Sequence, residues 1–210
     1  MSQSNNSNWG ISGKAEGKQA KVWLKPEQVE AMRTACYSDS FADYLQERNE
    51  AWFVFAYDTG LRNVETLEVT WEDIDLDAGT LYLRSEVQKG KNKPPVTMSL
   101  ADETVRILRK YKGRMFRDSD FLFPSRQSDC MTDRALRNMV EAVAVEAEVM
   151  PYLAEGGRGV PEDVSPHTMR HSLAYRMIQV EGQRMEDVML RLRHSSILTT
   201  DQIYSHLQTV

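Results

Sequence analysis

The sequence predicts a mainly α-helical domain with one small antiparallel β-sheet, an α+β fold. Apolar residues recur at helical spacing along most of the chain from Pro26 onward. The spacing changes to the alternation typical of strands only over residues 80–83 and 96–98, on either side of a lysine-rich turn. A hydrophobic content of 41% and a charged content of 27% are ordinary for a globular chain of 210 residues.

The N-terminal half predicts three helices and a turn region. Pro26 fits the first position of a helix, and a second helix over 41–56 runs on to a glycine stop at Gly60. A short helix follows over 62–67. Residues 71–79 are predicted to form turns.

The predicted sheet follows. A turn over 89–93 joins the two strands, and Pro94 and Pro95 indicate an exposed edge strand. Residues 151–163 are rich in Gly and Pro and predict a mobile loop. The remaining predicted helices cover 101–112, 132–147, 167–180, 184–191 and 199–206.

The domain boundary is predicted near residue 20. Residues 1–20 are polar and small, and cannot bury enough surface to offset the entropy of ordering, so a disordered tail is expected before one domain over 21–210.

No apolar run is long enough to span a bilayer, and the N-terminus lacks the apolar region of a signal peptide. We therefore expect a cytoplasmic protein that does not bind membranes.

Charge is distributed unevenly along the chain. The net charge of −5 argues against nucleic acid as a partner, because binding duplex DNA rests largely on neutralising phosphates. Residues 84–117, however, hold ten basic residues and three acids, whereas residues 62–77 hold six acids and one arginine. Two interpretations remain open: a DNA-facing basic surface on an acidic body, or a set of solvated helix faces.

Cysteine and histidine spacing gives no metal site. Cys36 and Cys130 are the only cysteines and lie far apart, so free structural thiols are expected. His167 and His171 are four residues apart, but the glutamate of the zinc-protease motif is absent and no third ligand is evident. No metal is therefore predicted.

One predicted helix carries a pair of groups suited to a phosphate. Ser165 is a good N-cap and Pro166 fits the first helical position. His167 and Arg170 are then three residues apart and share a face. A guanidinium can grip two phosphate oxygens and an imidazole can move a proton near neutral pH. The alternative is a capped helix with a surface histidine and arginine.

A late tyrosine adds a nucleophile. Tyr204 follows Thr199 and Thr200, which can cap a short final helix. A phenol becomes a nucleophile only when a proton acceptor or a cation assists it. A core or surface tyrosine is the alternative, but all four histidines of the chain lie in its last 44 residues, close in sequence to this tyrosine.

Three segments in order resemble the motifs of one family. Residues 59–65 (TGLRNVE) resemble its first box, residues 167–171 (HTMRH) its second box, and residues 192–197 (LRHSSI) its third box, with Tyr204 as the nucleophile. The family is the tyrosine recombinases, the phage-integrase family of site-specific DNA recombinases, and the resemblance covers roughly 22–206. It implies a tyrosine recombinase catalytic domain.

The resemblance also implies roles for the residues that match. Arg62, Arg170 and His194 would hold the scissile phosphate and stabilise the pentavalent transition state. His167 would accept or donate a proton. Tyr204 would attack and leave a 3′-phosphotyrosine and a free 5′-hydroxyl, with neither metal nor nucleotide cofactor.

Supporting residues follow from the same resemblance. Glu65 and His171 would orient the arginines. The family places a lysine in a β-hairpin turn, where it protonates the leaving 5′-oxygen. Counting back from Leu100 favours Lys91 for that role, and Lys89 is its alternative.

The implied partner is a duplex DNA attachment site. The expected DNA-binding residues are Lys89, Lys93, Arg84 and Arg193. Arg193 occupies the position of a glycine usual in the third box, so it either adds a phosphate contact or alters that turn. The chain is expected to be a monomer when free and a homotetramer on DNA, associated with the nucleoid of a prokaryotic host or acting in a virus-infected cell.

Several alternatives stay open at this point. The overall reaction would be integration, excision or inversion, and the rivals are a type IB-like topoisomerase, a dimer resolvase and a non-catalytic DNA-binding relative. A chance match in an unrelated helical domain would leave the boxes far apart in space. Relatives usually carry an N-terminal helical domain that residues 1–20 cannot supply, so the chain is expected to be a catalytic fragment, a minimal enzyme, or one that borrows this domain.

Overall fold

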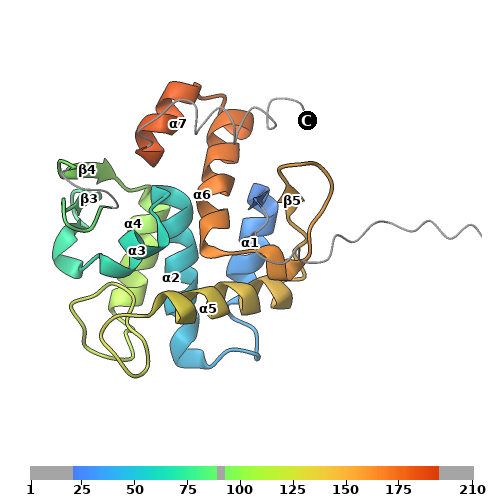
Figure 1. Cartoon of the computed structure of the whole chain (residues 1–210). Helices are drawn as coiled ribbons and strands as arrows, with labels where there is room; N and C mark the ends of the chain where they lie inside the picture. The colour runs from blue at the N-terminus through green and yellow to red at the C-terminus, as the bar shows by residue number, and fades with distance from the viewer. Residues whose placement is uncertain (1–20, 89–92, 194–210) are drawn as a thin grey trace, which may run out of the picture.

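The computed structural model describes residues 21–88 and 93–193. Helices surround one central helix, and small sheets lie at two sides of them (Figure 1). The helices are α1 (Pro26–Ala35), α2 (Asp43–Thr59), α3 (Asn63–Glu68), α4 (Asp102–Lys112), α5 (Asp133–Glu146), α6 (Pro166–Tyr175) and α7 (Met185–Leu192). The predicted fold class is confirmed, while the predicted tail over 1–20 and helix over 199–206 lie outside the described residues.

The strands form two antiparallel sheets. They are β1 (Val22–Trp23), β2 (Ile74–Asp75), β3 (Thr80–Leu83), β4 (Val96–Ser99) and β5 (Tyr152–Leu153). One sheet has the order β2-β3-β4, with β4 at an edge as Pro94 and Pro95 indicated, and the other pairs β1 with β5. The two sheets lie on opposite sides of the helices (Figure 1).

Two segments differ from the prediction, and the second of them adds another sheet. Residues 71–79, predicted as turns, contain a 3₁₀ turn (Trp71–Asp73) and then β2. The segment 151–163, predicted as a mobile loop, contains β5 and a second 3₁₀ turn, Pro161–Asp163. Strands of two residues are too short to show an alternating pattern. In addition, β5 pairs with β1, which is distant in the sequence, and local sequence cannot reveal that pairing.

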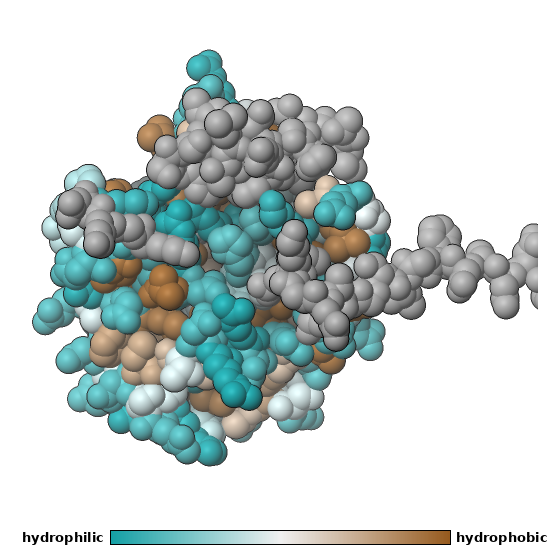
Figure 2. Space-filling model, viewed as in Figure 1, coloured by the Kyte–Doolittle hydropathy of each residue, from teal (hydrophilic) through white to brown (hydrophobic). Residues whose placement is uncertain are grey.

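The core is centred on α2. Its residues from Arg48 to Thr59 are all buried, and the helix contacts α1, α4 and α6. Trp52, Phe53 and Phe55 supply its largest buried apolar side chains. An all-round buried helix is typical of the centre of a domain rather than its surface. The visible described surface is mostly hydrophilic, with scattered apolar residues (Figure 2).

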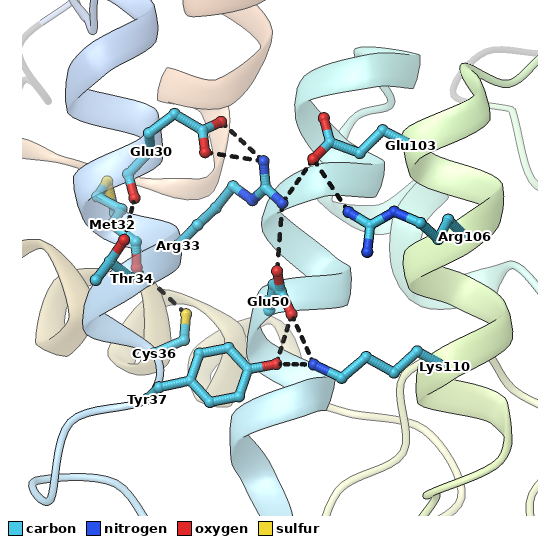
Figure 3. A network of polar contacts seen from close by, with 10 residues as sticks. All are labelled: Glu30, Met32, Arg33, Thr34, Cys36, Tyr37, Glu50, Glu103, Arg106 and Lys110. Carbon is cyan, nitrogen blue, oxygen red and sulfur yellow. Dashed lines mark hydrogen bonds and ion pairs between the residues drawn. The ribbon is translucent and has the colours of Figure 1, made fainter.

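A polar network fastens α1 to α2 and α4 (Figure 3). Glu50 of α2 accepts a hydrogen bond of 2.5 Å from the Tyr37 hydroxyl and lies 3.3 Å from the Arg33 guanidinium. Arg33 also donates to Glu103 of α4, at 2.9 Å. Lys110 donates to the Tyr37 hydroxyl at 2.7 Å. Burial and the bond to Glu50 raise the pKa of Tyr37, so the phenol stays neutral and continues to donate.

Gly60 joins the core to the first box. It ends α2 in the left-handed conformation, with φ of 60°, and its N–H donates to Ala56 O at 3.0 Å. A Cβ built on it would lie 2.6 Å from a Leu192 methyl carbon and 2.7 Å from one of Leu173. Only glycine allows both the left-handed conformation and the close approach of these two leucines. The turn therefore lets α7 and α6 pack against the end of α2, just before Arg62.

We predict that Gly60→Ala lowers the free energy of unfolding by more than the strain of a left-handed alanine alone would. The conformational strain costs about 1–2 kcal/mol. Overpacking against Leu173 and Leu192 adds about 1–3 kcal/mol. Denaturant unfolding measures the sum.

Gly182→Ala is the matched control. Gly182 has φ of 65°, and nothing lies within 4 Å of a Cβ built on it. The Gly182→Ala variant should therefore lose only the stability that corresponds to the conformational strain. Equal losses of unfolding free energy in the two variants would contradict the close packing of α6 and α7 against Gly60.

Among the described residues, no helix combines the length and apolar character needed to cross a membrane. Likewise, the described part of the chain contains no group of three or more His, Cys, Asp or Glu side chains that could hold a metal ion.

Candidate active site

The first box places an arginine over a buried carboxylate. Arg62 is the N-cap of α3, and Glu65 is the third residue of that helix. One oxygen of Glu65 accepts the Arg62 backbone N–H at 2.8 Å, and the other lies 3.0 Å from Arg62 Nη1. The Glu65 side chain is fully buried, whereas 22% of the Arg62 side chain is exposed. The carboxylate therefore contacts both the backbone and the guanidinium of Arg62.

The second box begins where the sequence predicted. Ser165 is the N-cap of α6 and Pro166 its first residue. His167 is exposed and His171 is buried, and their rings meet edge to face with centroids 4.8 Å apart. Leu24 donates its backbone N–H to Ser172 Oγ at 2.9 Å, which ties the N-terminal strand to this helix. The helix thus presents His167 from its first turn, while its later part is tied to the N-terminal strand.

Arg170 links the three boxes through the backbone. Its Nη1 donates to the carbonyl oxygen of Gly60, and its Nη2 donates to that of Leu192. The side chain is 2% exposed. A guanidinium carries further N–H donors besides these two. The geometry brings Arg170 to the turn that carries Arg62, although 108 positions separate them in the sequence.

Arg193 turns inward at the end of α7. It adopts the left-handed conformation, with φ of 53°. Its Nη2 lies 2.6 Å from the Glu65 carboxylate and its Nη1 lies 3.2 Å from Met98 Sδ. Only 8% of its side chain is exposed. The guanidinium expected to contact DNA is therefore held against the protein.

Lys93 belongs to the same cluster of charges. Partial burial lowers its pKa from the ordinary lysine value of 10.5, and the positive charges of Arg62, Arg193 and Arg170 lower it further, against the opposing effect of Glu65. The sequence assigned this residue to DNA binding and favoured Lys91 for catalysis. Lys89, Lys91, His194 and Tyr204 lie outside the described residues.

The basic stretch over 84–117 is largely neutralised by the protein itself. Across the described residues, six of its cations form ion pairs: Arg84 with Asp73, Arg106 with Glu103, Arg109 with Asp77, Lys110 with Glu50, Arg114 with Glu47 and Arg117 with Asp129. Arg84, an expected DNA contact, lies 2.7 Å from Asp73. The acids in these pairs come mostly from other segments, so local sequence counts overstated the positive charge of this surface.

The sequence did not predict a second junction, between α7, α2 and β4. Arg191 of α7 lies 2.7 Å from Asp58 at the end of α2 and donates to Ser99 O of β4 at 3.0 Å. The other Asp58 oxygen accepts from Ala101 N at 2.8 Å and Thr104 Oγ1 at 2.7 Å, which caps α4. Neither Arg191 nor Asp58 belongs to one of the three boxes. The junction nevertheless holds the helix that leads into the third box.

Comparison with known proteins shows the family of the chain. A family model described as "Phage integrase family" matches residues 22–209. The chain therefore belongs to the phage integrase family.

Sequence relatives are named tyrosine recombinases. The chain is 29% identical over 161 residues to tyrosine recombinase XerC of Xanthomonas axonopodis pv. citri, covering 76% of this chain and 47% of that protein. It is 28% identical over 197 residues to tyrosine recombinase XerD of Pseudomonas putida, covering 91% of this chain and 59% of that protein. The chain thus spans about half the length of these relatives.

Solved structures share the fold. The crystal structure of XerA recombinase matches with a TM-score of 0.68 at 22% identity, over 94% of this chain and 64% of that one. XerH site-specific recombinase bound to difH substrate, in a pre-cleavage complex, matches with a TM-score of 0.65 at 20% identity, over 89% of this chain and 51% of that one.

We predict that the Lys93 ammonium titrates below 10.5 and that Arg62→Ala raises its midpoint. Removing a positive neighbour makes the protonated lysine easier to keep, so the pKa moves toward the ordinary value. The side-chain NMR signals of isotope-labelled lysine, followed across pH, measure the midpoint, and Lys93→Arg assigns the signal.

Lys25 serves as the internal control. Its pKa is raised by a hydrogen bond to Tyr152, on a different part of the fold, and it should not respond to Arg62→Ala. A Lys93 midpoint at or above 10.5 in the parent chain would contradict its place among the arginines.

Proposed function

We propose that this chain is the catalytic domain of a site-specific DNA recombinase, which cleaves and rejoins duplex DNA through a 3′-phosphotyrosine. The observation that carries the proposal is the meeting of three boxes, the first and third at one buried carboxylate and the second at the backbone of the other two. Arg62 and Arg193 both bind Glu65, and Arg170 joins Gly60 to Leu192. Membership of the phage integrase family and relatives named tyrosine recombinases support it.

Phosphate binding is the first task of the proposed site. Arg62 and Arg193 contact the carboxylate of Glu65, and the positive charges of Arg62, Arg170 and Arg193 act on nearby Lys93. Cations held in place before the reaction stabilise the charge that develops on the phosphate oxygens, with no cost of reorganisation during the step. In the proposal Arg62, Arg170 and His194 hold those oxygens, while Glu65 and His171 hold the arginines.

Strand cleavage then needs two proton transfers. The Tyr204 oxygen attacks phosphorus as its proton passes to a base, for which His167 is the proposed acceptor. The bond from phosphorus to the 5′-oxygen breaks, and that oxygen takes a proton from a lysine of the turn. Lys91, with Lys89 as its alternative, is favoured by position, and Lys93 is a third candidate because a lowered pKa makes its ammonium a stronger acid. Rejoining runs the same steps in reverse.

The proposed partner is a duplex attachment site bound by four copies of the chain. Each strand exchange joins two duplexes, so a tetramer supplies one site for each strand end. The substrate would place the protein with the nucleoid, or with viral DNA, in the cytoplasm. Integration, excision or inversion of a mobile element is the proposed use.

We predict that the chain forms a covalent adduct with DNA and that Tyr204→Phe abolishes it. The variant removes the attacking oxygen and leaves the cationic site in place. A library of nicked duplexes with randomised sequence is incubated with the chain, and DNA retained on protein after denaturation is sequenced. Because the library is randomised, the attachment site does not have to be chosen before the experiment.

Two controls make this test decisive. Tyr82, an exposed tyrosine on β3, is changed to Phe as the matched variant and should leave the adduct intact. A plasmid relaxation assay without site preference tests for a topoisomerase instead. An adduct that survives Tyr204→Phe would contradict the proposal, as would DNA binding with no adduct in a chain supplied with the N-terminal domain of a relative.

We predict that one of the turn lysines donates the proton to the leaving oxygen. Lys89→Ala, Lys91→Ala and Lys93→Ala are compared, and loss of the proton donor should slow cleavage by about 100-fold or more. Replacing the bridging 5′-oxygen with sulfur gives a leaving group that needs no proton, so only the true donor's variant regains the parent rate. Lack of rescue in all three would contradict a lysine donor.

A further inference from the structure

Arg193 stands out because its conformation is unfavourable and both terminal nitrogens of its buried side chain have partners. Within the described residues, Glu148 and Arg193 are the non-glycine residues with positive φ, at 50° and 53°. Glu148 is exposed, whereas the Arg193 side chain is 8% exposed and ends on Glu65. A left-handed arginine persists only where its surroundings hold it.

The partner of Arg193 is the group that orients Arg62. Glu65 Oε2 receives Arg193 Nη2 at 2.6 Å and the Arg62 backbone N–H at 2.8 Å, while Oε1 receives Arg62 Nη1 at 3.0 Å. A carboxylate with donors on both oxygens cannot rotate freely. The position of the Arg62 guanidinium therefore depends on the contact from Arg193.

The contact also fixes α7 to α3. Arg193 directly follows Leu192, whose carbonyl oxygen accepts from Arg170, and directly precedes the histidine of the third box. Burial and the positive charges of Arg62 and Arg191 lower the pKa of Arg193, while Glu65 opposes them. The crowded cations are tolerated because one carboxylate serves two of them.

We infer that Arg193 is a positioning residue: it holds Glu65, and through it Arg62, in the geometry for strand cleavage, and does not contact a DNA phosphate. The inference rests on the proposed function. A glycine at this position would relieve the backbone but leave the buried Glu65 oxygen with one donor fewer. Stability and catalysis should then respond differently to its removal.

The test compares Arg193→Gly, Arg193→Lys and the control Glu148→Gly in the full chain. Glu148→Gly relieves the same backbone conformation at an exposed site, so it measures the gain from glycine alone. Arg193→Gly should show less of that gain in thermal unfolding, because it also loses the Glu65 contact. Arg193→Lys keeps the charge and should recover part of the lost function.

Cleavage and binding are measured on a nicked duplex taken from the adduct selection. At saturating DNA, Arg193→Gly should form the adduct about tenfold more slowly, or worse, than the parent chain, which corresponds to about 1.4 kcal/mol in the barrier. Its Kd for the duplex and the salt dependence of that Kd should stay unchanged. A positioning group affects the reaction, whereas a phosphate contact affects binding and its salt slope.

Three outcomes would overturn the inference. The first is an Arg193→Gly variant that cleaves at the parent rate. The second is weaker binding with a salt slope reduced by about one, which identifies a phosphate contact. The third is a gain in stability equal to that of Glu148→Gly. If the parent chain forms no adduct, the proposed function fails by itself, and the unfolding comparison still decides whether Arg193 holds α7 to α3.

Discussion

The geometry of the candidate site depends on the buried carboxylate of Glu65. A fully buried charge is costly unless donors surround it, and here Arg62 supplies two and Arg193 a third. The donors come from the start of α3 and the end of α7, which are far apart in sequence. Folding must bring both to the carboxylate, so satisfying one buried charge also assembles two of the three boxes.

The last turn of α7 shows how the rest of the molecule supports that assembly. Arg170 holds the Leu192 carbonyl oxygen, Arg191 holds Asp58 and Ser99 O, and Arg193 holds Glu65. Each contact reaches a different element, namely α6, the junction of α2 with β4, and α3. Three guanidinium contacts in three directions leave this turn little freedom, which is the condition for groups that must be in place before charge develops.

The sequence predicted most of the fold because its local signals are strong. Gly60 ends α2 and Pro166 begins α6, as glycine and proline usually do at these positions, and Glu65 and Arg62 lie together on one short helix. What it missed depends on contacts between distant segments. The pairing of β1 with β5 and the inward turn of Arg193 have no local pattern, because each is decided by a partner that only the folded chain brings near.

The charges of the chain explain why composition is a poor guide to the proposed partner. Most cations of the stretch over 84–117 that the structure describes already have an acid beside them, so they contribute little net field toward a phosphate backbone. At the site the arrangement differs: Arg62 and Arg193 both contact Glu65, and the charges of Arg62, Arg170 and Arg193 act on Lys93, so described cations are concentrated there. In the proposed reaction these cations face the one phosphate that is cleaved. In this proposal a protein with a net charge of −5 attracts an anion at the place where its cations are concentrated.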